Sequence, residues 1–215
     1  MGWRRDGPKL PDQLFCTSYC RQARNPLAEY RGELGKDHAM DDKWSIHISQ
    51  AEIAQAVARL AQAIDQDYAG RSLIVVAVLK GAFIFVADLI RQLETPVDRV
   101  ELLRLASYGS ATTSSGQVKV LVDLPAGAVT DQHVLLVEDI VDTGRSTTVA
   151  INLLKEQNPA SVRLCSLLDK PARRIVPVAI DYLGLSIEDK FVIGYGLDWD
   201  ERYRDLPDIY VVEES

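Results

Sequence analysis

Hydrophobic residues follow two patterns that alternate along the chain from about residue 49 onward. In one pattern apolar residues recur at helical spacing, and in the other they form short continuous runs. The first helical stretch begins with Ser49 and Glu52, which form an S-x-x-E capping box, and should end near Gly70. The run from Leu73 to Leu79 (LIVVAVL) is apolar throughout, as expected for a strand covered on both faces. The predicted helices cover residues 49–70, 82–93 and 147–156, and the predicted strands cover residues 73–79, 100–105, 133–137 and 162–168.

This alternation of strands and helices predicts βαβ units. It indicates an α/β fold with an open, mostly parallel twisted sheet flanked by helices. In such sheets ligands bind at the carboxyl ends of the strands. The residues that follow each predicted strand are therefore the first candidates for a functional site.

Residues 1–40 differ from the rest because they show no sustained periodicity. We predict a disordered N-terminal extension at 1–40 and one domain at 41–215, which is long enough for a sizeable core. Two interpretations of the extension remain. Either Met40 is the physiological start of the protein, or the extension is a targeting or partner-binding arm. N-terminal mass spectrometry of the native protein distinguishes them.

Composition and charge narrow the range of partners. The net charge is −7, from 24 basic and 31 acidic residues, which disfavours a broad nucleic-acid interface. No apolar run reaches the length of a membrane-spanning helix, so we expect no membrane partner.

The cysteines indicate the compartment. Cys16, Cys20 and Cys165 are an odd number, and Cys165 falls within a predicted buried strand, which favours a reducing cytosol and a cytoplasmic protein. Cys16 and Cys20 with His38 lack a second close pair to complete a zinc site, so we expect no zinc.

The segment 134–148 (VLLVEDIVDTGRSTT) contains the strongest functional signal. A predicted strand is followed by Glu138, Asp139 and Asp142, and then by a loop typical of phosphate binding. Three carboxylates would repel a phosphate, so they must serve something else. Ribose hydroxyls, a divalent metal ion and a proton in transit are the candidates.

The phosphate loop itself comprises Thr143, Gly144, Arg145, Ser146 and Thr147. It leads into a predicted helix, whose first N–H groups and positive dipole end attract an anion. Gly144 lets the backbone approach the ligand closely. The chain has no GxxxxGK[ST] sequence, so this is not a nucleoside-triphosphate loop.

The string VEDIVDTGRSTT resembles the phosphoribosyl-diphosphate (PRPP) binding motif of type I phosphoribosyltransferases. Four further segments resemble hypoxanthine-guanine phosphoribosyltransferases, in order and at suitable spacing: LKGA at 79–82, SYGSATTSSG at 107–116, LLDKPARR at 167–174 and DKFVIGYGLDWDERYRDLP at 189–207. The likeness covers about residue 41 to the C-terminus. It implies a type I phosphoribosyltransferase fold with a small hood, formed by the C-terminal segment and part of the N-terminal region.

The resemblance also implies a reaction in purine salvage. The enzyme would transfer the 5-phosphoribosyl group from PRPP to N9 of hypoxanthine or guanine, giving IMP or GMP and diphosphate, with Mg²⁺ as cofactor. Glu138 and Asp139 would hold the ribose hydroxyls, directly or through metal. Asp142 would be the catalytic base for the purine N7 proton. The loop from Thr143 to Thr147 would bind the 5-phosphate.

Further residues take their expected roles from the same resemblance. Lys80, Gly81 and Arg204 would bind diphosphate, and the peptide bond before Lys80 is expected to be cis. Lys170 would donate to the purine 6-oxygen, which discriminates against a 6-amino purine.

The remaining assignments concern the base and the lid. Phe191 would stack on the base, although by its sequence alone it fits a core strand position. The Val192 backbone would contact the other edge of the base, and Asp198 would meet both the purine site and Mg²⁺. Ser107 and Tyr108 belong to a predicted lid that would exclude water from the ribose centre.

Two other functions stay open at this point. One is a non-catalytic regulator on the same fold that binds nucleic acid, which a filter-binding assay with salt titration would reveal. The other is a related transferase that prefers xanthine. Relatives form dimers and tetramers, so the resemblance also implies a homodimer or homotetramer.

Overall fold

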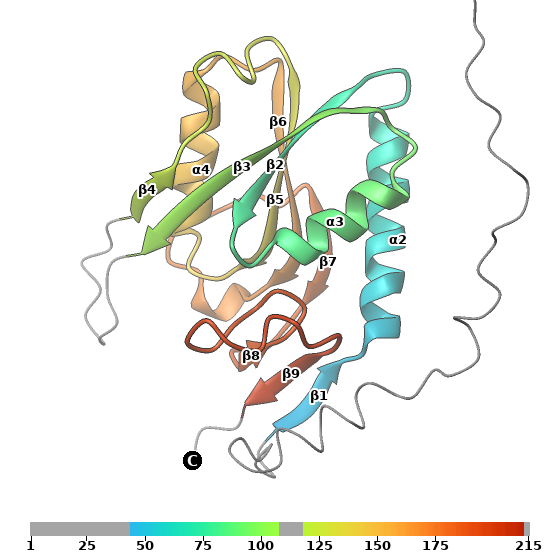
Figure 1. Ribbon diagram of the computed structural model, residues 1–215, viewed down its shortest axis with the longest axis vertical. Coiled ribbons are helices and arrows are strands. Elements are labelled where there is room, and N and C mark those ends of the chain that lie inside the picture. The colour runs from blue at the N-terminus through green and yellow to red at the C-terminus, as the bar shows by residue number, and fades with distance from the viewer. Residues whose placement is uncertain (1–43, 108–117, 213–215) are drawn as a thin grey trace, which may run out of the picture. The chain divides into compact units, whose positions relative to one another are not determined.

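The computed structural model describes residues 44–107 and 118–212. The predictions for residues 1–40 and for Tyr108 lie outside these residues. The helical elements are α2 (Gln50–Asp67), α3 (Phe83–Gln92), α4 (Arg145–Glu156) and the short 3₁₀ helix η2 (Pro171–Arg173). The strands are β1 (Trp44–Ile48), β2 (Leu73–Leu79), β3 (Val97–Ser107), β4 (Val118–Val122), β5 (His133–Val141), β6 (Ser161–Asp169), β7 (Tyr182–Ser186), β8 (Phe191–Ile193) and β9 (Ile209–Val212) (Figure 1).

A six-stranded sheet forms the centre of this region, with strand order β4-β3-β2-β5-β6-β7. Its neighbouring strands are parallel except for β3 and β4, which are antiparallel. The predicted α/β fold with an open, mostly parallel sheet is therefore confirmed. Because β2, β5 and β6 are parallel neighbours, their carboxyl ends meet at one edge of the sheet.

Alternate side chains of β2 enter two separate hydrophobic cores, as the period of a strand requires. Val75 and Ala77 pack in the core that contains α2 and α3, whereas Ile74, Val76 and Val78 pack in the core that contains α4. Helices thus cover both faces of the sheet (Figure 1). This explains why LIVVAVL has no polar position.

Helix α2 begins where the sequence predicts. The side chain of Ser49 accepts from the Glu52 N–H, and the Glu52 carboxylate accepts from the Ser49 N–H at 2.8 Å, so the capping box is complete. Such caps stabilise a helix start by about 1 kcal/mol.

A second sheet, with order β1-β9-β8, is antiparallel and joins the two ends of the described chain. The Gln50 N–H donates to Asp208 Oδ1 at 2.7 Å, and the Tyr195 hydroxyl donates to Asp88 Oδ2 at 2.6 Å, which ties this sheet to α2 and α3. Strand β1 comes from the N-terminal region, and β8 and β9 come from the C-terminal segment. The resemblance implies that these two parts of the chain form a hood. That it covers the site stays a prediction.

The structure corrects several predicted element bounds. Strand β5 continues to Val141, so Glu138 and Asp139 lie within the strand rather than after it. Helix α4 begins at Arg145, two residues earlier than predicted, because Gly144 adopts φ 82° and caps it. Strand β3 also runs from Val97 to Ser107, beyond the predicted 100–105. None of the described helices is long and apolar enough to cross a membrane.

Candidate active site

A pocket of about 370 Å³ lies at the carboxyl ends of β2, β3 and β5. Most of the predicted PRPP residues line it, together with Asp198 from the segment between β8 and β9. Its lining comprises Val78, Leu79, Gly81, Leu105, Glu138, Asp139, Ile140, Asp142, Thr143, Gly144, Ser146, Thr147 and Asp198.

Backbone hydrogen bonds from a later segment of the chain hold the loop between β5 and α4 in place. The Thr143 carbonyl accepts from the N–H groups of Ile175 and Val176, each at 3.0 Å. A Cβ at position 144 would lie 2.3 Å from the Val176 carbonyl oxygen, so glycine is required there by space as well as by φ. The Arg145 N–H donates to Thr143 Oγ1 at 3.4 Å at the start of α4.

Glu138 and Asp139 lie next to each other at the end of β5 with different surroundings. Glu138 is 5% exposed and accepts from Thr147 Oγ1 at 3.2 Å. Burial, reinforced by the charge of Asp139, raises the pKa of Glu138 well above its usual range. Burial also raises the pKa of Asp139 to about 6. The ionised form of each acid would therefore be stabilised by a bound cation or by hydrogen-bond donors.

Gly81 fits directly against Asp139. A Cβ at position 81 would lie 1.7 Å from Asp139 Oδ2, and a Cβ at Gly196 would lie 2.1 Å from the Gly81 carbonyl oxygen. Positions 81, 139 and 196 are far apart in sequence but meet here. The contacts leave room only for glycine at positions 81 and 196. The peptide bond Leu79–Lys80 is cis, as the resemblance predicts.

Four charged side chains form what we call the Lys80 cluster: Lys80, Asp198, Glu201 and Arg204. Lys80 Nζ lies 2.6 Å from Glu201 Oε2, and Arg204 Nη2 lies 2.8 Å from Asp198 Oδ1. Arg204 Nη2 also lies 3.4 Å from Glu201 Oε2, and its Nη1 donates to the Gly196 carbonyl at 2.7 Å. The two predicted diphosphate cations are therefore brought together, and both face carboxylates.

A second group, the Lys170 cluster, comprises Lys170, Asp142, Arg173 and Asp189. Arg173 Nε lies 3.0 Å from Asp142 Oδ1, and Arg173 Nη1 lies 3.6 Å from Asp189 Oδ1. Lys170 is 6% exposed, and burial lowers its pKa, although the charge of Asp142 opposes the shift. The backbone N–H of Lys170 donates to the Val141 carbonyl at 3.0 Å, which joins the ends of β5 and β6. Asp142 and Lys170, predicted separately, are thus neighbours.

Sequence reasoning missed Arg174. Its guanidinium donates to the Asp142 carbonyl at 2.9 Å and to the Val141 carbonyl at 3.0 Å, and it pairs with Asp169. It therefore connects the acidic end of β5 with the end of β6. Arg173 and Glu201 were also missed, since a charged residue in a polar segment gives no signal of its partner.

Phe191, the predicted stacking residue, is 43% exposed at the start of β8, so its core interpretation is wrong. Its ring centroid lies 6.0 Å from that of Trp199 at a steep angle. Val192, whose backbone is the predicted purine contact, has a buried side chain. Neither residue lines the pocket described above. Ser107, the first residue of the predicted lid, is the last residue of β3.

Among residues 44–107 and 118–212, no three His, Cys, Asp or Glu side chains form a group suited to hold a metal ion. The described part contains one cysteine, Cys165, which is free and buried in β6 as predicted. Burial raises the pKa of its thiol. The predictions on Cys16 and Cys20 lie outside the described residues.

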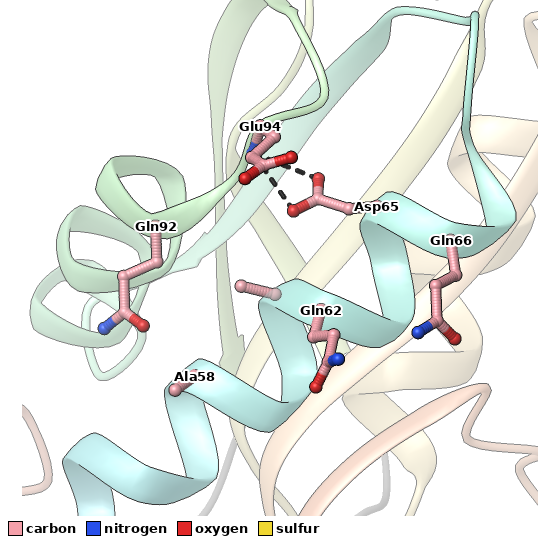
Figure 2. A pocket seen from close by; sticks show the side chains of 7 residues that line it. Ala58, Gln62, Asp65, Gln66, Gln92 and Glu94 are labelled. Carbon is pink, nitrogen blue, oxygen red and sulfur yellow. Dashed lines mark hydrogen bonds between the residues drawn. The ribbon is translucent and has the colours of Figure 1, made fainter.

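A second pocket, of about 430 Å³, lies between α2 and the end of α3 (Figure 2). Its lining comprises Ala58, Ala61, Gln62, Asp65, Gln66, Gln92 and Glu94. The Asp65 carboxylate accepts from the Glu94 N–H at 3.0 and 3.1 Å and from the Thr95 N–H at 2.8 Å. These bonds fix the chain after α3 to α2, so the acid has a structural role.

Comparison with known proteins agrees with this geometry. Residues 46–200 match the model of the phosphoribosyl transferase domain. The chain belongs to the phosphoribosyltransferase family. Within that family it is 38% identical over 170 residues to the hypoxanthine-guanine phosphoribosyltransferase of Streptococcus thermophilus, which covers 79% of this chain and 93% of that protein. The resemblance found in the motifs is thereby confirmed.

A solved structure shows the same fold. The crystal structure of a hypoxanthine-guanine phosphoribosyltransferase from Bacillus anthracis matches with a TM-score of 0.73 and 38% identity, covering 79% of this chain and 98% of that one.

A longer relative adds one point. The bifunctional protein TilS/HprT of Listeria innocua is 36% identical over 207 residues, which are 96% of this chain and 32% of that protein. The chain thus spans about a third of that relative's length. Because the alignment covers 207 of 215 residues, it extends into residues 1–40, further than the motifs indicate.

Proposed function

We propose that this chain transfers the 5-phosphoribosyl group from PRPP to N9 of a 6-oxopurine, hypoxanthine or guanine, and releases diphosphate. The products are IMP or GMP, and the role is purine salvage. One observation supports this most strongly. The buried residue Lys170 directly follows β6, and its backbone N–H donates to the Val141 carbonyl at the acid-rich end of β5, which leads into the phosphate loop.

Lys170 suits the recognition of a 6-oxo group. A buried ammonium needs an acceptor, and the 6-oxygen of hypoxanthine or guanine supplies one. Adenine would place an amino donor there and leave the lysine unpaired. Phe191, which is exposed on β8, would stack on the base, and the Val192 backbone would contact the other edge of the base.

The three acids divide into two roles by their surroundings. Asp142 belongs to the Lys170 cluster, so we assign it to the purine N7 proton as N9 attacks the anomeric carbon. Glu138 and Asp139 lie further back on β5 and would hold the ribose hydroxyls. Their raised pKa values fit groups that gain stability when donors or a cation arrive.

The two phosphate groups would bind at two places, one at the loop that lines the pocket and one beside the pocket, at Lys80 and Arg204, which do not line it. The 5-phosphate would bind the loop from Thr143 to Thr147, at the N-terminus of α4. Diphosphate would bind Lys80, Arg204 and the N–H of Gly81. The cations would stabilise charge on the leaving group as its bond to ribose breaks.

Magnesium fits the donor set as a shared ion rather than a resident one. Mg²⁺ uses few protein carboxylates and completes its shell with water and substrate phosphates. Glu138, Asp139 and Asp198 line the same pocket and would offer oxygens alongside PRPP. When bound, Mg²⁺ would neutralise charge on the diphosphate.

Other proposals concern the rest of the chain. We propose that residues 41–215 form the phosphoribosyltransferase domain, that residues 1–40 extend it, and that Ser107 and Tyr108 belong to a lid. Exposed apolar side chains on α3, β3 and β4 support self-association as a homodimer or homotetramer; they are Phe83, Val100, Leu102 and Leu121. We further propose a cytoplasmic enzyme without nucleic-acid or membrane partners.

The test is PRPP-dependent nucleotide formation with hypoxanthine, guanine, xanthine and adenine, side by side. Nucleotide should form with hypoxanthine or guanine and not with adenine. A preference for xanthine would correct the substrate. Nucleic-acid binding without any nucleotide formation would replace the proposal by the regulatory function.

A further inference from the structure

Glu201 contacts both cations assigned to diphosphate. Its Oε2 lies 2.6 Å from Lys80 Nζ and 3.4 Å from Arg204 Nη2. These ion pairs lower the pKa of the Glu201 carboxyl, chiefly through the hydrogen bond from Lys80, so it remains ionised at neutral pH. A carboxylate therefore faces the two positive charges that a diphosphate would need.

The backbone presents Glu201 in a constrained turn. Trp199 and Arg202 exchange backbone hydrogen bonds at 3.2 and 3.1 Å around Asp200 and Glu201. Asp200 has φ 51° and Glu201 has φ 66°, a left-handed conformation that favours Gly or Asn over a longer residue. The Glu201 N–H also donates to Asp198 Oδ2 at 2.9 Å. Backbone strain of this kind is characteristic of functional segments.

The charges of the Lys80 cluster already balance without a ligand. Two cations, Lys80 and Arg204, face two acids, Asp198 and Glu201. Asp198 lines the pocket, and Mg²⁺ could neutralise it there when PRPP binds. Glu201 does not line the pocket, and its side chain is 61% exposed, so it is free to rotate into solvent.

We propose that Glu201 is an internal competitor for diphosphate. Its carboxylate occupies the partners of the diphosphate group in the ligand-free chain and must move away when that group binds. Glu201 thereby weakens the affinity for diphosphate and favours its release. This inference rests on the proposed function, because it assumes that Lys80 and Arg204 bind diphosphate.

The experiment measures binding of inorganic diphosphate, with Mg²⁺ present, to the full-length protein by titration calorimetry. Glu201→Gln keeps the shape of the side chain and removes its charge, so diphosphate should bind roughly three- to tenfold tighter. Glu201→Asp keeps the charge but cannot reach both cations, so it should gain part of this affinity. Asp200→Asn removes one charge from the neighbouring position and should stay within about twofold of wild type.

The outcomes separate the two claims. If Glu201→Gln and Glu201→Asp bind diphosphate no tighter than wild type, the competitor role is wrong. It is also wrong if Asp200→Asn gains as much as Glu201→Gln, since the effect would then be one of general charge. A wild-type protein that forms no nucleotide and binds no diphosphate overturns the proposed function and this inference together.

Discussion

The Lys170 cluster and the Lys80 cluster have the same charges, but their lysines differ in burial. Each contains two cations and two acids at the carboxyl end of the sheet. Lys170 is 6% exposed and anchored at the end of β6. The side chain of Lys80, by contrast, is 41% exposed, and that of its partner Glu201 is 61% exposed. The other members of both clusters are partly exposed.

This difference suggests a division of labour in the proposed reaction. A buried lysine discriminates, because a ligand that leaves a buried donor unpaired loses the full cost of its desolvation. Exposed ion pairs contribute little and exchange partners readily, which suits a group that must leave after each turnover. We therefore assign choice of base to the Lys170 cluster and release of diphosphate to the Lys80 cluster.

The largest expected effect is at Asp142, a member of the Lys170 cluster. Asp142→Ala should lower kcat by roughly a hundredfold or more, because the purine N7 proton loses its acceptor. PRPP binding, measured by calorimetry, should be retained. Asp189→Asn removes a charge from the same cluster and serves as the control, with a much smaller loss. Unchanged turnover in Asp142→Ala would remove the assignment.

The next effect is expected where Gly81 meets Asp139. Gly81→Ala places a methyl group where Asp139 Oδ2 lies, so the acid must shift. A displacement of about 1 Å at a catalytic site can cost about a hundredfold, and we expect a loss of this size in kcat/KM for PRPP.

Gly70→Ala is the matched control, since Gly70 has φ 76° and open space around its Cβ. It should lose about 1 kcal/mol of stability and no activity. Equal activity losses in the two variants would show that the contact between Gly81 and Asp139 is unimportant.

A smaller effect concerns stability and pH. The pKa of Asp139 is raised to about 6 in the folded protein, so the folded state binds a proton that the unfolded state releases above pH 4. The free energy of unfolding of the ligand-free protein should therefore fall as pH rises from about 4 to 6, by about 1–3 kcal/mol. Glu138, whose pKa is also raised, acts in the same direction.

Urea unfolding at several pH values checks this prediction. Asp139→Asn should show a flatter dependence on pH and greater stability at neutral pH than wild type. A wild-type profile as flat as that of Asp139→Asn would contradict the raised pKa.

The elements and site residues that depend on a local pattern of residues could be predicted from the sequence. The run LIVVAVL fills two cores, so it could have no polar residue, and its bounds were correct. Gly144 and the acids of β5 were recognised because their order along one segment is itself the signal. Lys170 was recognised through the resemblance of LLDKPARR to the family.

Contacts between distant segments were not predictable in this way. The antiparallel sheet pairs Trp44 with Val212, and Glu201 meets Lys80 across 121 positions of sequence. Arg174 reaches back to the Asp142 carbonyl, a contact that depends on how β5 and β6 align. Periodicity reports which face of an element is buried, not which charged side chain meets another.

The most direct test of the division of labour compares hypoxanthine and adenine as substrates of wild type and Lys170→Met, by kcat/KM at saturating PRPP. The ratio of hypoxanthine to adenine should be high in wild type and fall about ten- to a hundredfold in Lys170→Met, with KM for PRPP unchanged. Lys155→Met, which removes an exposed lysine of α4, should keep the wild-type ratio. An undiminished ratio in Lys170→Met would contradict the account.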